Sequence, residues 1–546
     1  MDKGQTSWRG GRDMAPAQLA GVLAVIGAGV LVAMGGCGGR DTPNEACVII
    51  DRQAKVRPDY GGAVLPPNIA PLNFAIEESG TRYLVRVHAT QGEPIEVFSR
   101  TPEIYIPRRP WHRLLENNRG GTLKLDIFVK SGPAPGAEDP SGQWTRFART
   151  TSRIANENVD DFIVYRRIRP GHSLWRRMGI YQRDLRTYDE TVILDNDYYQ
   201  QGCVNCHTFC NHRADKMLLG IRSATYGSSA ILVEDEHVSK IGTKFGYTSW
   251  HPSGAVAAFS INRVRQLLHS GANEVRDVLD YDSLLAYYRL DEKAVRTAPP
   301  LARKDWLETY PTWSPDGQYL YFCCAPITWE DRHTIPAEYD QIRYSLVRIR
   351  YDLDSDQWGE LETVLSADQT GQSVLLPRIS PDGRWLLFTL CDYGCFPVYR
   401  QSSDLYLMDL EAARQTGRYE YRRLSINSNA SESWHSWSSN GRWIAFSSKR
   451  LSHVLTRTYL AYVDDRGTVH KPLLLPQKDP RFYDSCLWTF SVPELVTERV
   501  PVARETIARV IRGVKQTSVQ MPITMASPRQ EATAAHDEPW QQSGSR

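Results

Sequence analysis

The chain has 546 residues, too many for one ordinary hydrophobic core, so we expect more than one structural unit. Its 65 Lys and Arg residues nearly balance its 63 Asp and Glu residues. Because no basic run with interleaved aromatic residues stands out either, the composition argues against nucleic acid as a partner.

Residues 1–44 have the pattern of an export signal or a membrane anchor. Basic residues precede an apolar run over 15–34, and Gly35-Gly36-Cys37 follows the run. This ending resembles the cleavage box of bacterial lipoproteins, which implies a lipid on Cys37, although Met34 stands where leucine is usual. The same run is long enough to remain as an uncleaved transmembrane anchor. Both alternatives tether the protein to a membrane and place its body in a periplasm-like compartment.

Residues 45–200 carry short alternating runs that Gly- and Pro-rich stretches separate. Apolar and polar residues alternate over 83–87, 94–97 and 123–129. A period of two is typical of strands that bury one face. We therefore predict an N-terminal β-sandwich-like domain in this part of the chain.

Residues 203–207 read Cys-Val-Asn-Cys-His, the attachment pattern of a c-type haem. In this chemistry the thiols of Cys203 and Cys206 form thioethers with the porphyrin, and His207 becomes an axial ligand of the iron. With only 10 Cys and 13 His in the chain, chance is a poor explanation. We predict one covalent haem c on an attachment segment, 201–219.

Two other chemistries stay open for the same residues. Cys210 and His212 extend the cluster, so half of a zinc site is one alternative. A redox dithiol is the other. A zinc site usually draws on a second Cys-x-x-Cys pair, and a redox dithiol on a βαβ context, and the sequence shows neither. The haem interpretation is therefore preferred.

The second axial position decides what a haem does. Met217 lies ten residues after His207, and a thioether ligand raises the reduction potential, which suits electron transfer. His212 is the alternative, although it is only five residues from His207. An arginine-rich stretch over 165–186 precedes the motif and is a candidate partner for a haem propionate.

Residues 220–480 contain a fourfold repeat of an aromatic or apolar residue, a polar turn, a glycine and an alternating strand. Pro presets such a turn, Asp or Asn bonds the local backbone, and Gly supplies the positive φ. The four repeats begin at Trp250, Trp313, Ile379 and Trp437. Each predicts one four-stranded blade, and a strand pair over 230–241 predicts part of another. Because a closed ring protects strand edges, we predict a propeller of five or six blades.

These repeats resemble the TolB-type propeller family, in which W-S-P-D-G marks each blade. The wider arrangement is similar to a bacterial family that joins a single haem-c motif to such a propeller. The residues that carry this likeness include 179–185, 202–207 and 391–407. The resemblance implies a TolB-like propeller, a haem at the Cys-x-x-Cys-His motif and a methionine at the position of Met217. It implies no activity.

The C-terminal part divides in two. Residues 481–516 form an extension in which we predict a helix between Pro493 and Lys515. Residues 517–546 are polar, and we predict that they are disordered.

Together these features predict a mainly β, membrane-tethered periplasmic cytochrome that exchanges electrons with a redox protein partner. One alternative is an interaction scaffold, in which the propeller binds a protein partner and the haem is structural. Another is a haem-dependent oxidoreductase with its site in the propeller funnel, where Glu432, His435 and Asp392 are candidate polar groups. Fold analogy alone does not establish catalysis.

Overall fold

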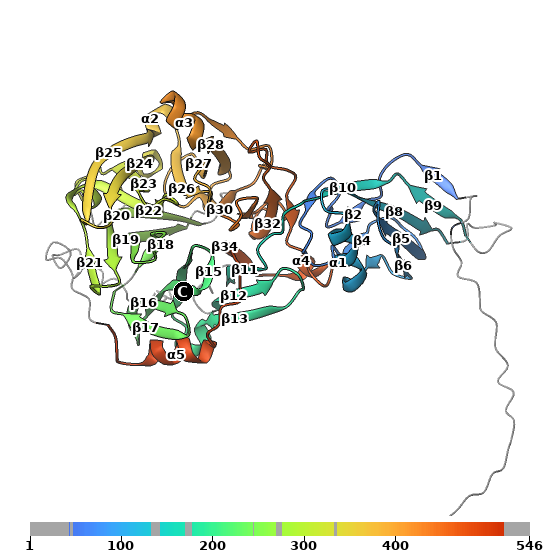
Figure 1. Ribbon diagram of the computed structural model, residues 1–546, viewed down its shortest axis with the longest axis horizontal. Helices are drawn as coiled ribbons and strands as arrows, with labels where there is room; N and C mark the ends of the chain where they lie inside the picture. Colours follow the sequence, from blue (N-terminus) through green and yellow to red (C-terminus); the bar gives the residue numbers. More distant parts are fainter. Residues whose placement is uncertain are drawn as a thin grey trace, which may run out of the picture. The chain divides into compact units, whose positions relative to one another are not determined.

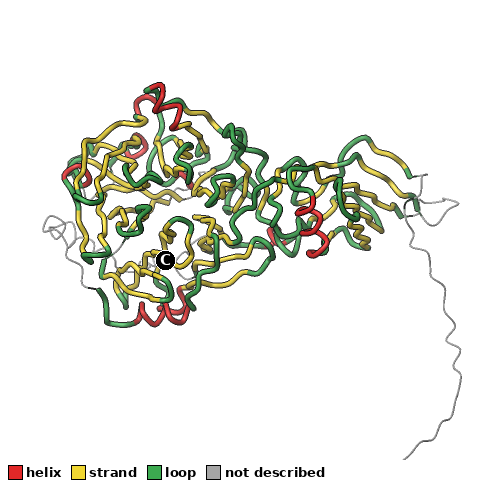
Figure 2. The backbone as a smooth tube through the Cα atoms, viewed as in Figure 1, coloured by secondary structure: helices red, strands yellow, loops and turns green. Residues whose placement is uncertain are grey.

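The computed structural model describes residues 43, 47–132, 142–169, 177–243, 245–268, 276–331 and 336–517. Strands dominate this part of the chain and the helices are short (Figure 2). The apolar run over 15–34, Cys37 and the tail after residue 517 lie outside the described residues, as does the side chain of Cys206. Among the helices that are described, none has the length and apolar character needed to cross a membrane.

The N-terminal domain packs two sheets around one core. The larger sheet contains β1 (Val48–Ile50), β3 (Val64–Leu65), β5 (Arg82–His88), β6 (Ile95–Ser99), β8 (Thr122–Lys130), β9 (Trp144–Phe147) and β10 (Thr150–Ile154). The smaller contains β2 (Val56–Arg57), β4 (Phe74–Ile76) and β7 (Glu103–Ile104), and α1 (Arg108–Asn117) follows it. Val85 and Ile127 of the larger sheet share a buried cluster with Phe74 and Ile104 of the smaller. The predicted β-sandwich-like domain is therefore confirmed.

Six antiparallel four-stranded sheets form the propeller (Figure 1). Blade 1 is β14 (Cys203–Cys210), β15 (Arg213–Ser223), β16 (Gly227–Glu234) and β17 (His237–Ile241). Blade 2 is β18 (Gly246–Trp250), β19 (Val256–Leu268), β20 (Arg276–Arg289) and β21 (Ala294–Arg296). Blade 3 is β22 (Trp306–Trp313), β23 (Tyr319–Pro326), β24 (Ser345–Asp352) and β25 (Gln357–Leu365). Blade 4 is β26 (Ser373–Ile379), β27 (Trp385–Cys391), β28 (Asp404–Asp409) and β29 (Tyr421–Arg423).

Blade 5 is β30 (Glu432–Trp437), β31 (Trp443–Ser448), β32 (Arg457–Tyr462) and β33 (Leu473–Leu474). Blade 6 takes its strands from both ends of the part of the chain that forms the propeller. Its innermost strand, β34 (Thr489–Val496), pairs with β11 (Phe162–Ile168). The outer strands β12 (Met178–Asp184) and β13 (Glu190–Asp195) complete the sheet in the order β13-β12-β11-β34. Short helices α2 (Ala367–Thr370), α3 (Leu410–Thr416) and α4 (Phe482–Ser485) connect strands, and α5 (Arg504–Arg512) follows β34.

The six innermost strands close into a ring. Each of β14, β18, β22, β26, β30 and β34 contacts the innermost strand of both neighbouring blades. The predicted propeller thus has six blades, and its limits differ from those expected. Part of the segment 45–200 belongs to blade 6, and the extension 481–516 supplies its innermost strand. The helix predicted between Pro493 and Lys515 covers only Arg504–Arg512.

The four repeat turns form as the sequence predicts. Gly254, Gly317, Gly383 and Gly441 have φ angles of 72°, 73°, 72° and 67°, the left-handed region in which a side chain is disfavoured. In blade 3, the Asp316 carboxylate accepts a hydrogen bond from the backbone N–H of Gln318, at 3.0 Å. Local turn chemistry therefore sets the link between the first two strands of blades 2 to 5.

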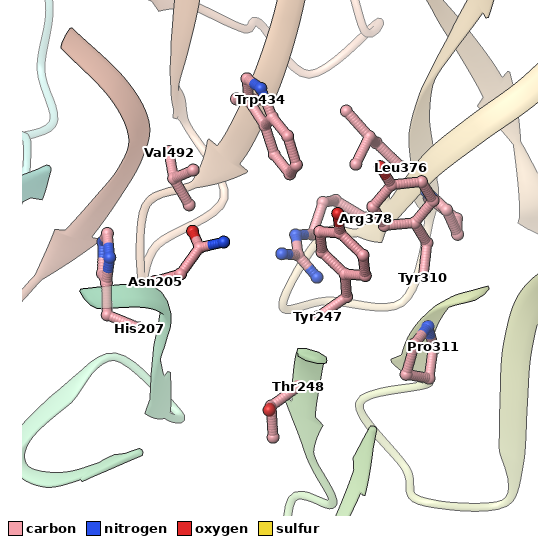
Figure 3. A pocket seen from close by; sticks show the side chains of 11 residues that line it. Asn205, His207, Tyr247, Thr248, Tyr310, Pro311, Leu376, Arg378, Trp434 and Val492 are labelled. Atoms are coloured by element: carbon pink, nitrogen blue, oxygen red, sulfur yellow. The ribbon is translucent and has the colours of Figure 1, made fainter. Parts of the chain in front are cut away.

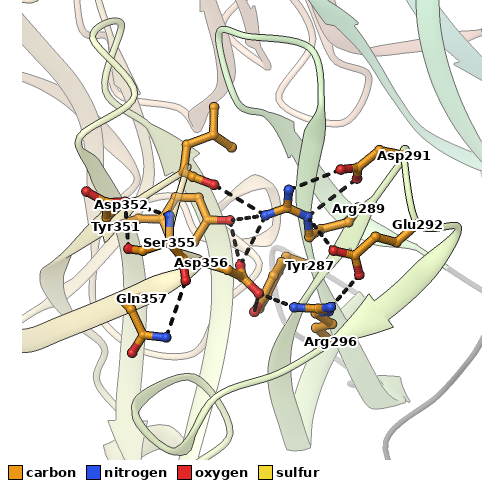
Figure 4. Close-up of polar contacts among 11 residues, drawn as sticks. Tyr287, Arg289, Asp291, Glu292, Arg296, Tyr351, Asp352, Ser355, Asp356 and Gln357 are labelled. Carbon is orange, nitrogen blue, oxygen red and sulfur yellow. Dashed lines mark hydrogen bonds and ion pairs between the residues drawn. The ribbon is translucent and has the colours of Figure 1, made fainter.

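An ionic network ties blade 2 to blade 3 (Figure 4). Asp356, in the turn after β24, accepts a hydrogen bond from the Tyr351 hydroxyl at 2.7 Å and one from the Tyr287 hydroxyl of blade 2 at 3.2 Å. It also forms ion pairs with Arg296 and Arg289 of blade 2. Because several partners share one carboxylate, this network fixes the two blades more firmly than an isolated surface ion pair would.

Candidate functional site

Each innermost strand carries a bulge at the same point. The pairing with the next strand shifts register between Asn205 and Thr208 in β14, and the other five innermost strands show an equivalent break. At five of the six bulges a non-glycine residue has a positive φ between 46° and 54°. These residues are Tyr247, Tyr310, Leu376, Trp434 and Val492. Bulky residues rarely adopt this conformation, and such strain is typical of functional positions.

The bulges surround a small cavity on the propeller axis (Figure 3). All six innermost strands contribute to its wall. The lining residues are Asn205, His207, Tyr247, Thr248, Tyr310, Pro311, Leu376, Pro377, Arg378, Trp434 and Val492. The cavity volume is about 30 Å³, enough for one or two ordered water molecules.

The Cys-x-x-Cys-His motif lies at this axis. Its residues form the first part of β14, and Cys206 and His207 fall within the register break of that strand. The motif therefore does not form a separate segment between two domains, as the boundaries 201–219 predict. Residues 203–223 are the two inner strands of blade 1.

His207 is a buried imidazole. The residue is 2% exposed, and in the described part of the chain neither ring nitrogen has a hydrogen-bond partner of good geometry, although the backbone of Val164 and of Val492 favours the charged ring. Burial, together with the charges of Arg166 and Arg378, lowers the pKa of His207 to about 3. The neutral ring keeps one nitrogen lone pair, which is what binding to a metal requires.

Of the two cysteines of the motif, Cys203 has a described side chain. Cys203 is buried in the cluster between blades 1 and 6, and the Arg222 guanidinium lies 3.5 Å from its sulfur. The donor set of a buried thiol and a neutral imidazole on one strand fits attachment of a haem. The cavity volume does not hold a porphyrin, so an attached haem must displace lining side chains or lie outside the cavity.

The two predicted second ligands do not lie at this cavity. Met217 is on β15, paired with Phe209, and is fully buried in the cluster between blades 1 and 6. His212 is in the turn between β14 and β15, where its Nδ1 lies 3.0 Å from the carbonyl oxygen of Leu495. The structure brings neither residue to the cavity wall that His207 forms.

The zinc alternative also lacks a gathered ligand set. Cys203 packs toward blade 6, whereas Cys210 belongs to the cluster on the side of blade 2. Within the described ranges, no three His, Cys, Asp or Glu side chains gather as a metal site would require. Among the described residues, Cys210 and His212 therefore do not combine with Cys203 into a zinc site.

One arginine of the stretch 165–186 reaches the axis. Arg166 of β11 donates to the Asn205 side-chain oxygen and, at 3.2 Å, to the Ser491 hydroxyl of β34. Arg166 thereby joins blade 6 to the cavity-lining strand of blade 1. In contrast, Arg183 donates to the carbonyl oxygen of Pro476 and Arg186 pairs with Asp184, so these two have structural partners.

The candidate catalytic groups of the funnel are also bound by structural partners. Glu432 is fully buried and pairs with Arg450 at 2.9 Å. One ring nitrogen of His435 lies 3.1 Å from the carbonyl oxygen of Leu387. Asp392 is exposed. None of these three side chains lines the axial cavity.

Away from the axis, blade 2 buries a carboxyl group. Asp280 is fully buried, and the Asn262 amide donates to its Oδ2 at 2.5 Å. Burial raises the pKa of Asp280 to about 8. In the folded protein this carboxyl therefore keeps its proton at a pH at which the unfolded chain has lost it.

Asp280→Asn is expected to reduce the pH dependence of stability. An unfolded Asp titrates near about 4, so the stability that this carboxyl contributes is complete below that pH and is lost as the pH rises toward about 8. As the pH rises from about 5 to 8, we expect the free energy of unfolding of the wild type to fall by ~1 kcal/mol or more beyond the fall seen in the variant. Urea unfolding at several pH values measures the difference, and parallel profiles would contradict the assignment.

The axial residues were missed by sequence reasoning, although the sequence carries a signal for them. In each repeat the bulge residue stands three places before the aromatic or apolar residue that begins the repeat, as Tyr310 does before Trp313. Cys206 stands three places before Phe209 in the same way, and Val492 before Leu495. Aligning β14 and β34 with the four repeats would have placed the haem motif on the axis.

Comparisons with known proteins leave the family open. No family model matches the chain, and no curated protein matches it. Among solved structures, the chain is similar to hydrazine synthase from Kuenenia stuttgartiensis at 16% identity and a TM-score of 0.29, covering 50% of this chain and 65% of that one. It is similar to oligogalacturonate lyase from Vibrio parahaemolyticus at 10% identity and a TM-score of 0.30, covering 53% of this chain and 85% of that one. It is also similar to prolyl oligopeptidase B from Galerina marginata at 13% identity and a TM-score of 0.32, covering 54% of this chain and 40% of that one. Likeness at this level carries no functional conclusion, and the propeller assignment depends on strand order and ring closure.

Proposed function

We propose that the protein is a membrane-tethered, periplasmic monohaem c-type cytochrome that transfers electrons to or from a protein partner. The observation that carries this proposal is His207, a buried neutral imidazole within a Cys-x-x-Cys-His strand, whose ring nitrogens have no well-aligned hydrogen-bond partner among the described residues. A buried polar side chain in a native protein normally has a hydrogen-bond partner. A His207 ring that binds a haem iron would have no need of another partner for the nitrogen that holds the iron.

Three residues of β14 would hold the haem. Cys203 and Cys206 would form the thioethers, and His207 would occupy one axial position. The haem supplies a one-electron couple whose potential depends on the second ligand and on burial. The chain supplies a rigid setting, since β14 is held by β15 on one side and by contacts with β18 and β34 around the ring.

Electron transfer is favoured over catalysis because of where the polar groups are. Glu432 and His435 are bound to structural partners, and the axial cavity is too small for an organic substrate beside a cofactor. The propeller rim would dock the redox partner. Lipidation of Cys37, or the uncleaved apolar run over 15–34, would tether the protein to the membrane.

His207→Ala is expected to keep the covalent haem and lose its low-spin spectrum. The thioethers do not depend on the imidazole, whereas the iron loses an axial ligand. The measurement is the absorption spectrum of the reduced and oxidised protein, made with the haem-attachment machinery present. A spectrum identical to that of the wild type would contradict the role of His207.

Met217→Ala and His212→Ala are the matched variants for the second ligand. If Met217 binds the iron, its variant loses the low-spin ferrous spectrum while the His212 variant keeps it. If neither variant changes the spectrum, both assignments fall and the second axial position belongs to another residue or is open. Attachment itself is scored separately, by the mass of the denatured chain.

A further inference from the structure

Two nitrogen donors, from Asn205 and Arg378, face each other across the axial cavity, and none of the described side chains that line it places a carboxylate between them. The Asn205 side-chain oxygen accepts a hydrogen bond from Arg166, so the amide orientation is set and its NH2 group points into the cavity (Figure 3). The guanidinium of Arg378 points toward the same space from the opposite wall (Figure 3). Converging donors in an enclosed space require an acceptor.

Arg378 also lacks a compensating charge. Its side chain donates to the Thr312 hydroxyl at 3.2 Å, and that hydroxyl in turn donates to the carbonyl oxygen of Pro377 at 2.6 Å. Among the described residues, no carboxylate lies within ion-pair distance of Arg378. Glu494 of β34 is influenced by its charge, but burial raises the pKa of Glu494 to about 7. Arg378 is partly buried, so a bound anion would offset the cost of removing part of its charge from water.

The remaining wall is aromatic. The ring centres of Tyr247 and Tyr310 lie 4.4 Å apart, and Trp434 lies 6.1 Å from Tyr247 and 6.0 Å from Tyr310. Tyr310 is buried, whereas Tyr247, Trp434 and Arg378 are partly buried, so the wall limits the access of bulk water to Arg378 and strengthens a charge interaction there. The cavity volume of about 30 Å³ admits one small ion or one carboxylate group.

We propose that the axial cavity is an anion site, in which Arg378 and Asn205 bind one carboxylate group. This site shares β14 with the haem motif, because Asn205 stands between Cys203 and Cys206, and it would exist in the haem-free protein. The carboxylate has two possible sources. It is either a small free acid of the size of formate or, when haem is attached, one of the haem propionates.

Calorimetric titration of formate into the haem-free full chain tests the site directly. Such protein is obtained from a host that lacks the haem-attachment machinery. We expect one formate per chain, with roughly 10- to 100-fold weaker binding in Arg378→Gln, as loss of a charged hydrogen bond predicts. Arg378→Lys keeps the charge without the planar fork and should show a smaller loss. Arg414→Gln, on the exposed helix α3, is the matched control and should bind like the wild type.

The outcomes separate the sources and can overturn the proposal. If formate binds the haem-free chain but not the haem-loaded chain, the attached haem occupies the site, either with a propionate or by displacing its lining side chains. If it binds both alike, the ligand is a free anion. A folded haem-free chain that takes up no formate, or an Arg378→Gln chain that binds it as the wild type does, shows that the cavity holds water only. Because the first titration contains no haem, failure of the cytochrome proposal would leave its result unaffected.

Discussion

A chain that ends after Leu487 is expected to fail to form the propeller. It lacks β34, the innermost strand of blade 6, in which Phe490, Leu495 and Val496 are buried. Without it, β11 loses its inner partner, and the ring opens between blades 5 and 1. An open ring exposes unpaired strand edges and apolar surface on both sides of the gap. The loss is comparable with the entire stability of a typical domain, about 5–15 kcal/mol.

Circular dichroism and urea unfolding of the truncated chain measure this effect. The control is a chain that ends after Thr517, which keeps β34 and α5 and removes only residues outside the described ranges. We expect the control to unfold cooperatively and the shorter chain to show no cooperative transition. A cooperative transition in both would show that closure by β34 is not required.

Replacing Cys203 and Cys206 together with Ser is expected to reduce covalent haem from one per chain to none. Thioethers form only at these two thiols if the motif has been interpreted correctly. Cys210→Ser is the matched control, because Cys210 lies on the same strand but packs toward blade 2. Mass spectrometry of the denatured chains after expression with the attachment machinery gives the count. Haem retained by the double variant, or lost by the control, would contradict the assignment.

The repeats of blades 2 to 5 could be predicted because their turns are local. Each contains a glycine with a positive φ a few residues from the strands that it joins, so short-range sequence carries the information. Blade 1 lacks that signal. Asn211 and His212 make its first turn instead, with φ angles of 51° and 62°. Its inner strands were therefore interpreted as an attachment segment.

Blade 6 could not be predicted for a different reason. β34 and β11 lie far apart in the chain, and only the closed ring brings them together. The same applies to the axial cavity, whose wall takes residues from six strands. Cys203, Cys206 and His207 are recognised from their spacing, whereas Arg378 lies in no motif and Asn205 occupies a variable position of the Cys-x-x-Cys-His motif. Met217 was chosen by its distance along the chain, which does not report that β15 buries it between blades.

The most direct test of the account is a reduced-minus-oxidised absorption spectrum of the full chain, expressed with the haem-attachment machinery, followed by pyridine haemochrome analysis. We predict a sharp c-type α band and one haem per chain that denaturation does not release. A colourless protein from a host that matures other c-type cytochromes would contradict the haem on β14 and leave a tethered six-bladed propeller.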